Sequence, residues 1–83
     1  MDWSVYIILC SDDSLYTGIT KDVDKRFLQH ASHKGAKYFR GREPIELVYQ
    51  EHGHDRSSAS KREIEIKRLN KQKKEELIAL SSK

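Results

Sequence analysis

Apolar residues crowd the start of the chain and then recur with changing spacing. The segment from Trp3 to Leu9 is apolar at nearly every position, which is typical of a strand covered on both faces. The run 11–14 is Ser-Asp-Asp-Ser, a sequence that favours a turn. Residues 15–20 then alternate as a second strand does, so the pattern predicts a hairpin.

The register of this hairpin decides which side chains share a face. With a loop of residues 12–14, Tyr16 is expected opposite Cys10. Alternation then places one polar-aromatic set on the same face: Tyr6, Cys10, Tyr16 and Gly18. The other face receives the better core residues: Val5, Ile7, Leu9, Leu15 and Ile19.

The next stretch has helical spacing. Asp22 suits an N-cap, and a helix is predicted from there to about Ser32, with an apolar stripe formed by Val23, Phe27 and Ala31. Arg26 and His30 border this stripe one turn apart. Both side chains are therefore expected to point into a groove beside the sheet.

The remaining elements are read in the same way. Residues 35–40 predict a short helical turn ended by Gly41, and the alternating run 45–50 predicts a third strand, followed by a loop over 51–55. A helix is predicted from Asp55 or Ser57 to about Leu69. Asn70 marks a break before a last helix that ends near Leu80.

These elements indicate an α+β fold in the order strand, strand, helix, strand, helix, helix. The 83 residues predict a single domain over 1–83, with 36% hydrophobic and 35% charged residues. No apolar run approaches the roughly 20 residues of a membrane span. The first residues do not resemble a secretion signal, and Cys10 is the single cysteine. The expected compartment is the cytoplasm.

The net charge of +3 is unevenly distributed. One short segment concentrates cations with only Glu43 nearby, and it is expected to contact phosphates: Lys34, Lys37, Arg40 and Arg42. The C-terminal third carries further lysines and arginines interspersed with glutamates. There, a solvated helix face and a polyanion-binding face explain the pattern equally well.

Candidate chemistry begins with Arg26, because a guanidinium fork matches phosphate oxygens and stays charged; the alternative is a surface arginine beside Asp22. Tyr6 and Tyr16 are most often half-buried strand aromatics. A phenol titrates near ~10, so a role as base requires a nearby cation. Gly18 inside a strand indicates the close approach of a ligand or another backbone.

Glu63 and Lys67 are four residues apart on a predicted helix. One carboxylate with waters and phosphate oxygens is an ordinary Mg²⁺ site. The alternative is an ion pair between the two, in the favoured glutamate-first orientation. The nearby His52, His54 and Asp55 have no clustered further ligands, so no transition-metal site is predicted.

Taken together, these residues resemble the GIY-YIG endonuclease superfamily. The order and spacing of four motifs carry the resemblance: Val5-Tyr6-Ile7, Tyr16-Thr17-Gly18, Arg26-x-x-x-His30 and Glu63-x-x-x-Lys67. The stretch 35–38, with Arg40, Arg42 and Pro44, is similar to the small stand-alone bacterial proteins of that superfamily. Val5 and Thr17 stand where the family name has glycine and isoleucine. The resemblance implies a three-stranded antiparallel sheet flanked by helices.

It also implies residue roles. One of Tyr6 and Tyr16 would position or deprotonate the attacking water, and Arg26 would stabilise charge on the scissile phosphate. His30 would orient a tyrosine or relay a proton. Glu63 would hold one Mg²⁺ or Mn²⁺ ion. The remaining contacts to nucleic acid would come from Gly18, the cationic segment and Lys67, the last as a phosphate or structural contact.

The sequence thus supports a metal-dependent endonuclease acting on nucleic acid, on DNA in preference to RNA and in repair or recombination. The chain is expected to be a monomer directed by a partner protein. One alternative is a non-catalytic nucleic-acid-binding module that needs such a partner. Another is a protein-interaction domain that uses Leu77, Ile78 and Leu80.

Overall fold

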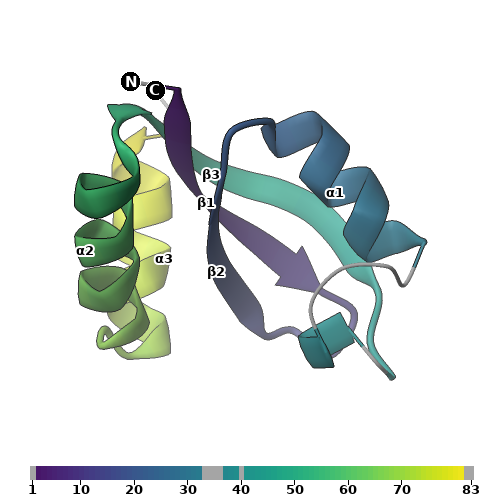
Figure 1. Ribbon diagram of the computed structural model, residues 1–83. Helices are drawn as coiled ribbons and strands as arrows, with labels where there is room; N and C mark the ends of the chain where they lie inside the picture. Colours follow the sequence, from purple (N-terminus) through teal and green to yellow (C-terminus); the bar gives the residue numbers. More distant parts are fainter. Residues whose placement is uncertain (1, 33–36, 40, 82–83) are drawn as a thin grey trace.

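The sheet lies at the centre of the computed structural model, which describes residues 2–32, 37–39 and 41–81 (Figure 1). Its strands are β1 (Trp3–Cys10), β2 (Leu15–Thr20) and β3 (Pro44–His54). They pair antiparallel in the order β2-β1-β3, so β1 is central and β2 is an edge strand. The three-stranded antiparallel sheet is as the resemblance implies.

Helices cover both faces of this sheet (Figure 1). Helix α1 (Val23–Ala31) and the short 3₁₀ turn η1 (Lys37–Phe39) lie on one face, while α2 (Arg56–Lys67) and α3 (Lys71–Ser81) lie on the other. The predicted α+β class and element order are confirmed. No helix of the described residues is long and apolar enough to cross a membrane.

Two hydrophobic clusters result from this layering. The cluster beneath α2 and α3 is built on Val5, Ile7, Tyr49, Ala59 and Ile66. The cluster beneath α1 and η1 is built on Tyr6, Ile8, Cys10, Val23 and Phe39. Because β1 supplies both clusters, almost all of its side chains are buried, as its continuous apolar run predicts. Cys10 is a buried free thiol, which fits a packing role.

The hairpin register differs from the prediction. Tyr16 lies opposite Ile8 rather than Cys10. The turn lies one residue earlier than expected, over residues 11–13: the Cys10 N–H donates to Ser14 O over 2.9 Å, and Asp13 adopts a left-handed φ of 67°. The difference is two residues, which preserves the alternation of side chains. Tyr6 and Tyr16 therefore share a face, as predicted.

Helix α1 begins where the sequence indicates. Asp22 is its N-cap, and its carboxylate accepts the Lys25 N–H over 3.1 Å. The expected place of Ala31 in the buried stripe is wrong, since Ala31 is exposed and His30 is completely buried. A nine-residue helix that buries Val23 turns position i+7, not i+8, toward the sheet.

The predicted loop over 51–55 is also wrong, because β3 continues to His54 and pairs with Trp3. A register irregularity between Trp3 and Val5, and a φ of 83° at Gly53, let the strand continue. Burial disfavours the charge of Glu51, but hydrogen bonds from Tyr49, His54 and Arg62 outweigh it and lower the pKa of that carboxyl. A charged residue is thus accommodated within the strand.

The last two helices follow the predicted caps. Asp55 is the N-cap of α2, and its carboxylate accepts the Ser58 N–H over 2.7 Å. Helix α2 ends at Lys67, two residues before the predicted Leu69. The Asn70 side chain accepts the Lys73 N–H over 2.9 Å at the start of α3.

Candidate active site

The centre of the candidate site is the hydroxyl of Tyr6. Tyr6 lies in the middle of β1 on the α1 face, with 1% of its surface exposed. Its Oη lies 3.0 Å from His30 Nε2. The charge of Arg26 also acts on this hydroxyl. The phenol and the imidazole form a buried hydrogen bond, in which the His30 tautomer sets which group donates.

Gly18 explains how the hydroxyl fits. It lies opposite Tyr6 in the β1–β2 pair. A Cβ at position 18 would lie 2.5 Å from Tyr6 Oη and 2.7 Å from Tyr6 Cζ. The glycine was predicted to mark the close approach of a ligand or another backbone; the group that approaches is instead a phenol of the neighbouring strand. Gly18 itself is buried.

We expect Gly18→Ala to displace the Tyr6 ring and break its hydrogen bond to His30, because the new methyl group overlaps the phenol. The expected loss in the free energy of unfolding is about 1–3 kcal/mol, as for other overpacked sites. Urea unfolding measures it. Tyr6→Phe is the matched background, since it removes the shorter of the two overlaps. If Gly18→Ala lowered the free energy of unfolding equally in the wild type and in Tyr6→Phe, this explanation would be contradicted.

Tyr16 is the more accessible phenol. It is half-buried on β2, and its ring centroid lies 4.9 Å from that of Phe39 and 5.0 Å from that of Tyr38. The His30 ring lies 5.3 Å away, edge to face. These rings fix the direction of Tyr16. Sequence reasoning assigned no role to Phe39; the aromatic pair Tyr38-Phe39 in an otherwise polar segment was the available signal.

His30 is a buried neutral base. Burial, and then the charge of Arg26, lower its pKa to about 4. None of its surface is exposed, so it cannot contact a substrate directly in this conformation. Of the two roles implied by the resemblance, orientation of a tyrosine matches this position. Relay of a proton would require a charged imidazolium inside an aromatic cluster.

The burial of His30 predicts a dependence of stability on pH. Its pKa is about 6.5 when unfolded and about 4 when folded. Between these values the unfolded state binds more protons, so the free energy of unfolding falls as the pH is lowered from 6.5 to 4. The expected loss is about 3 kcal/mol, and stability is complete above pH ~6.5. Urea unfolding at several pH values measures it.

The control is His30→Gln, which keeps an acceptor for the Tyr6 hydroxyl but does not titrate. The difference between the two pH profiles isolates His30 from the other acidic groups. Parallel profiles between pH 4 and 6.5 would show that His30 titrates normally.

Arg26 lies half-buried beside the phenols. Its Nη1 donates to Gln29 Oε1 over 3.0 Å, and its charge acts on Tyr6, Tyr16 and His30. The contact between Arg26 and Asp22 is a helical hydrogen bond, in which the Arg26 backbone N–H donates to the Asp22 backbone carbonyl oxygen. The side chain is thus turned toward the site, unlike the predicted alternative of a surface arginine beside Asp22.

Both phenols are neutral in this environment. Burial and the neighbouring Tyr16 raise the pKa of Tyr6, while Arg26 opposes the shift. Burial also raises the pKa of Tyr16, against the charges of Lys67 and Arg26. Near neutral pH, each hydroxyl therefore retains its proton and acts by hydrogen bonding.

Glu63 reaches this site electrostatically from α2. Its charge contributes to the raised pKa of both Tyr6 and Tyr16. Helix α2 packs on the opposite face of the sheet, but β2 is an edge strand, which brings α2 residues near the phenols. Lys67 Nζ lies 3.3 Å from Glu63 Oε2, so the ion pair predicted as an alternative is present.

The donor set around Glu63 fits a single divalent ion. No group of three or more His, Cys, Asp or Glu side chains gathers in the described part of the chain. One half-buried carboxylate, completed by waters and phosphate oxygens, is a suitable Mg²⁺ or Mn²⁺ site. His52 and His54 are hydrogen-bonded to Ser4 and Ser58, which accounts for them without a metal.

The structure describes two of the four residues in the predicted cationic segment, and they have different environments. Lys37 is exposed at the start of η1. Arg42 stacks on Tyr38, 4.0 Å from its ring centroid, and its Nε lies 2.9 Å from Asp12 Oδ2. Through these two contacts, Arg42 links η1 to the turn between β1 and β2. Lys34 and Arg40 lie outside the described residues.

The match to known proteins agrees with this geometry. A family model described as the GIY-YIG catalytic domain matches residues 2–76. The chain belongs to the GIY-YIG family. Its members include nucleases, so this is a domain of a nuclease family.

Proteins similar to this chain come from several organisms. The UPF0213 protein DP2720 of Desulfotalea psychrophila is 50% identical over 82 residues, which is 98% of this chain and 74% of that protein. The UPF0213 protein SSP2268 of Staphylococcus saprophyticus is 51% identical over 75 residues, 90% of this chain and 92% of the relative. The solution NMR structure of the UPF0213 protein BH0048 from Bacillus halodurans is 48% identical, with a TM-score of 0.62 over 98% of this chain and 86% of that one.

Proposed function

We propose that this GIY-YIG domain is a metal-dependent endonuclease that hydrolyses phosphodiester bonds in nucleic acid, in DNA in preference to RNA. The observation that carries the proposal is the environment of the Tyr6 hydroxyl. It lies 3.0 Å from a neutral imidazole and within the fields of Arg26 and Glu63. A purely structural tyrosine needs neither the buried base nor the carboxylate.

Arg26 is the proposed phosphate ligand. Its fork can bind two oxygens of the scissile phosphate and stabilise the negative charge that develops there. It is half-buried, which strengthens this interaction relative to one in open solvent. Gln29 holds the guanidinium in place before substrate binds.

Tyr16 is the proposed contact to the attacking water. Tyr6 and His30 are too deeply buried to reach it, with 1% and 0% of their surfaces exposed. Tyr16 is half-exposed, and its raised pKa keeps it a neutral phenol. Its Oη would orient the water by hydrogen bonding, while Tyr6 and His30 position Tyr16 from below. No covalent intermediate is involved.

Glu63 would hold the Mg²⁺ or Mn²⁺ ion, which supplies a Lewis acid for the phosphate oxygens. Without the ion, the ammonium of Lys67 supplies the positive charge beside the Glu63 carboxylate. Lys67 is half-exposed, so it can turn toward a backbone phosphate when the pair opens.

The test is a cleavage panel in Mn²⁺ with nicked, branched, single-stranded and RNA substrates, repeated in EDTA. We expect cleavage of at least one DNA substrate, and none in EDTA. Salt-sensitive binding that persists in EDTA, without cleavage of any substrate, would instead support the non-catalytic binding module.

A further inference from the structure

Trp3 has an unusual position at the entrance to β1. It is half-buried, and two cations lie over its ring: Lys21 Nζ at 5.8 Å from the centroid and Arg56 Cζ at 5.7 Å. Trp3 also packs against the cluster beneath α2 and α3. Aromatic side chains beside cations recur in surfaces that bind single-stranded nucleic acid.

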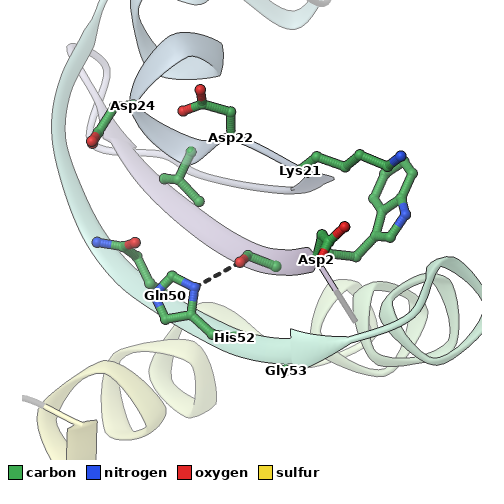
Figure 2. Close-up of a pocket in the computed structure, with 10 residues that line it drawn as sticks. Asp2, Lys21, Asp22, Asp24, Gln50, His52 and Gly53 are labelled. Carbon is green, nitrogen blue, oxygen red and sulfur yellow. Dashed lines mark hydrogen bonds between the residues drawn. The ribbon is translucent and has the colours of Figure 1, made fainter.

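Two hollows open beside this indole, and their charges differ. Figure 2 shows the first, whose lining includes Asp2, Asp22, Asp24, Lys21 and His52. Its three carboxylates outnumber its one lysine, so this hollow would repel a phosphate. The second hollow, of about 360 Å³, holds a single carboxylate, the Asp22 N-cap, and three cations: Lys21, Lys25 and Arg26.

The second hollow connects Trp3 to the proposed active site. Arg26 and Gln29 form one part of its lining, and Trp3 and Lys21 form another. A strand whose scissile phosphate is bound at Arg26 would therefore have a neighbouring nucleotide beside Trp3. The volume of the hollow lies within the range of small-ligand sites.

We propose that this hollow binds an unpaired nucleotide next to the scissile phosphate, with its base stacked on Trp3 and its phosphate on Lys21 and Lys25. The proposal rests on the endonuclease function, because Arg26 defines where the scissile phosphate lies. It specifies the substrate class: nucleic acid with a single-stranded segment at the cleavage position.

An unpaired nucleotide suits this site better than a base pair. Bases in a duplex cover one another's faces, whereas an unstacked base can lie on an indole. The incoming base would take the place of a cation over the Trp3 ring. If the base displaces Lys21, the Lys21 ammonium would bind the phosphate of the same nucleotide. The displaced cation would therefore keep a partner.

The chain provides its own probe, because Trp3 is its single tryptophan. In EDTA, titration with a ten-nucleotide oligothymidine should quench Trp3 fluorescence, and a blunt-ended duplex of two complementary strands should not. Trp3→Leu should weaken binding of the oligonucleotide about tenfold or more, while Trp3→Phe should retain most of it. Lys21→Gln should weaken binding and reduce its salt dependence.

Lys73→Gln is the charge-matched control, since Lys73 lies on α3 beside Glu76 and outside the hollow. Unchanged fluorescence, or equal affinity of wild type and a folded Trp3→Leu variant, would overturn the proposal. Cleavage in Mn²⁺ is measured separately. Cleavage that does not depend on Trp3 would refute the stacking site alone; quenching without cleavage would refute the nuclease and leave a single-strand binding site.

Discussion

Replacement of Arg26 by alanine is expected to slow nucleic-acid cleavage by about a thousandfold, the effect of removing a guanidinium from a phosphoryl-transfer site. The loss arises because Arg26 supplies the guanidinium whose charge acts on both phenols, whereas the ammonium of Lys67 is paired with Glu63 and has no planar fork for two phosphate oxygens. The fold should persist, since Arg26 is only half-buried and α1 retains its Asp22 cap. Single-turnover cleavage in Mn²⁺ measures the rate, and circular dichroism checks the fold.

Two variants control this result. Arg26→Lys keeps the charge but loses the fork, so we expect it to recover only part of the rate. Arg68→Ala removes an exposed arginine at the C-cap of α2 and should cut normally. An Arg26→Ala variant that stays within tenfold of wild type would exclude Arg26 from the catalytic site.

Replacement of Glu63 by glutamine is expected to reduce cleavage by about a hundredfold to a thousandfold, because the variant keeps the shape of the side chain but loses the charge that holds a divalent ion. The concentration of Mn²⁺ needed for half-maximal rate should rise as well. Both quantities come from the cleavage rate measured over a Mn²⁺ titration.

Glu65→Gln is the matched control. Glu65 lies on the same helix, 68% of its side chain is exposed, and it is 3.7 Å from Arg62. The Glu65→Gln variant should need no more Mn²⁺ for its half-maximal rate than the wild type needs. If Glu63→Gln and Glu65→Gln have the same Mn²⁺ requirement, the metal is not held at Glu63.

Local signals in the sequence predicted much of the fold. Residues 15–20 alternate as β2 does, and Asp22 and Asp55 cap the helices that follow them. These features depend on nearby residues, so they can be read from sequence. The extension of β3 to His54 depends instead on Arg62 of α2 and on pairing with Trp3, which no local pattern contains.

In the candidate site, too, the features that depend on nearby residues could be predicted, and those that depend on distant residues could not. The sequence predicted that Tyr6 and Tyr16 share a face and that Arg26 points beside the sheet, because strand alternation and helical spacing restrict where side chains point. It did not indicate that His30 is fully buried or that Arg42 is bound to Asp12. Both facts arise from the packing of α1 and η1 on the sheet, which brings distant residues together.

In the proposed endonuclease, side chains from β1, β2, α1 and α2 form one catalytic unit. The most direct measurement is the single-turnover cleavage rate of Tyr16→Phe, Glu63→Gln and the double variant. If the two residues act as a unit, the double variant should be nearly as fast as the slower single variant, because effects within a unit are not additive. A loss equal to the product of the two single losses would contradict the shared site.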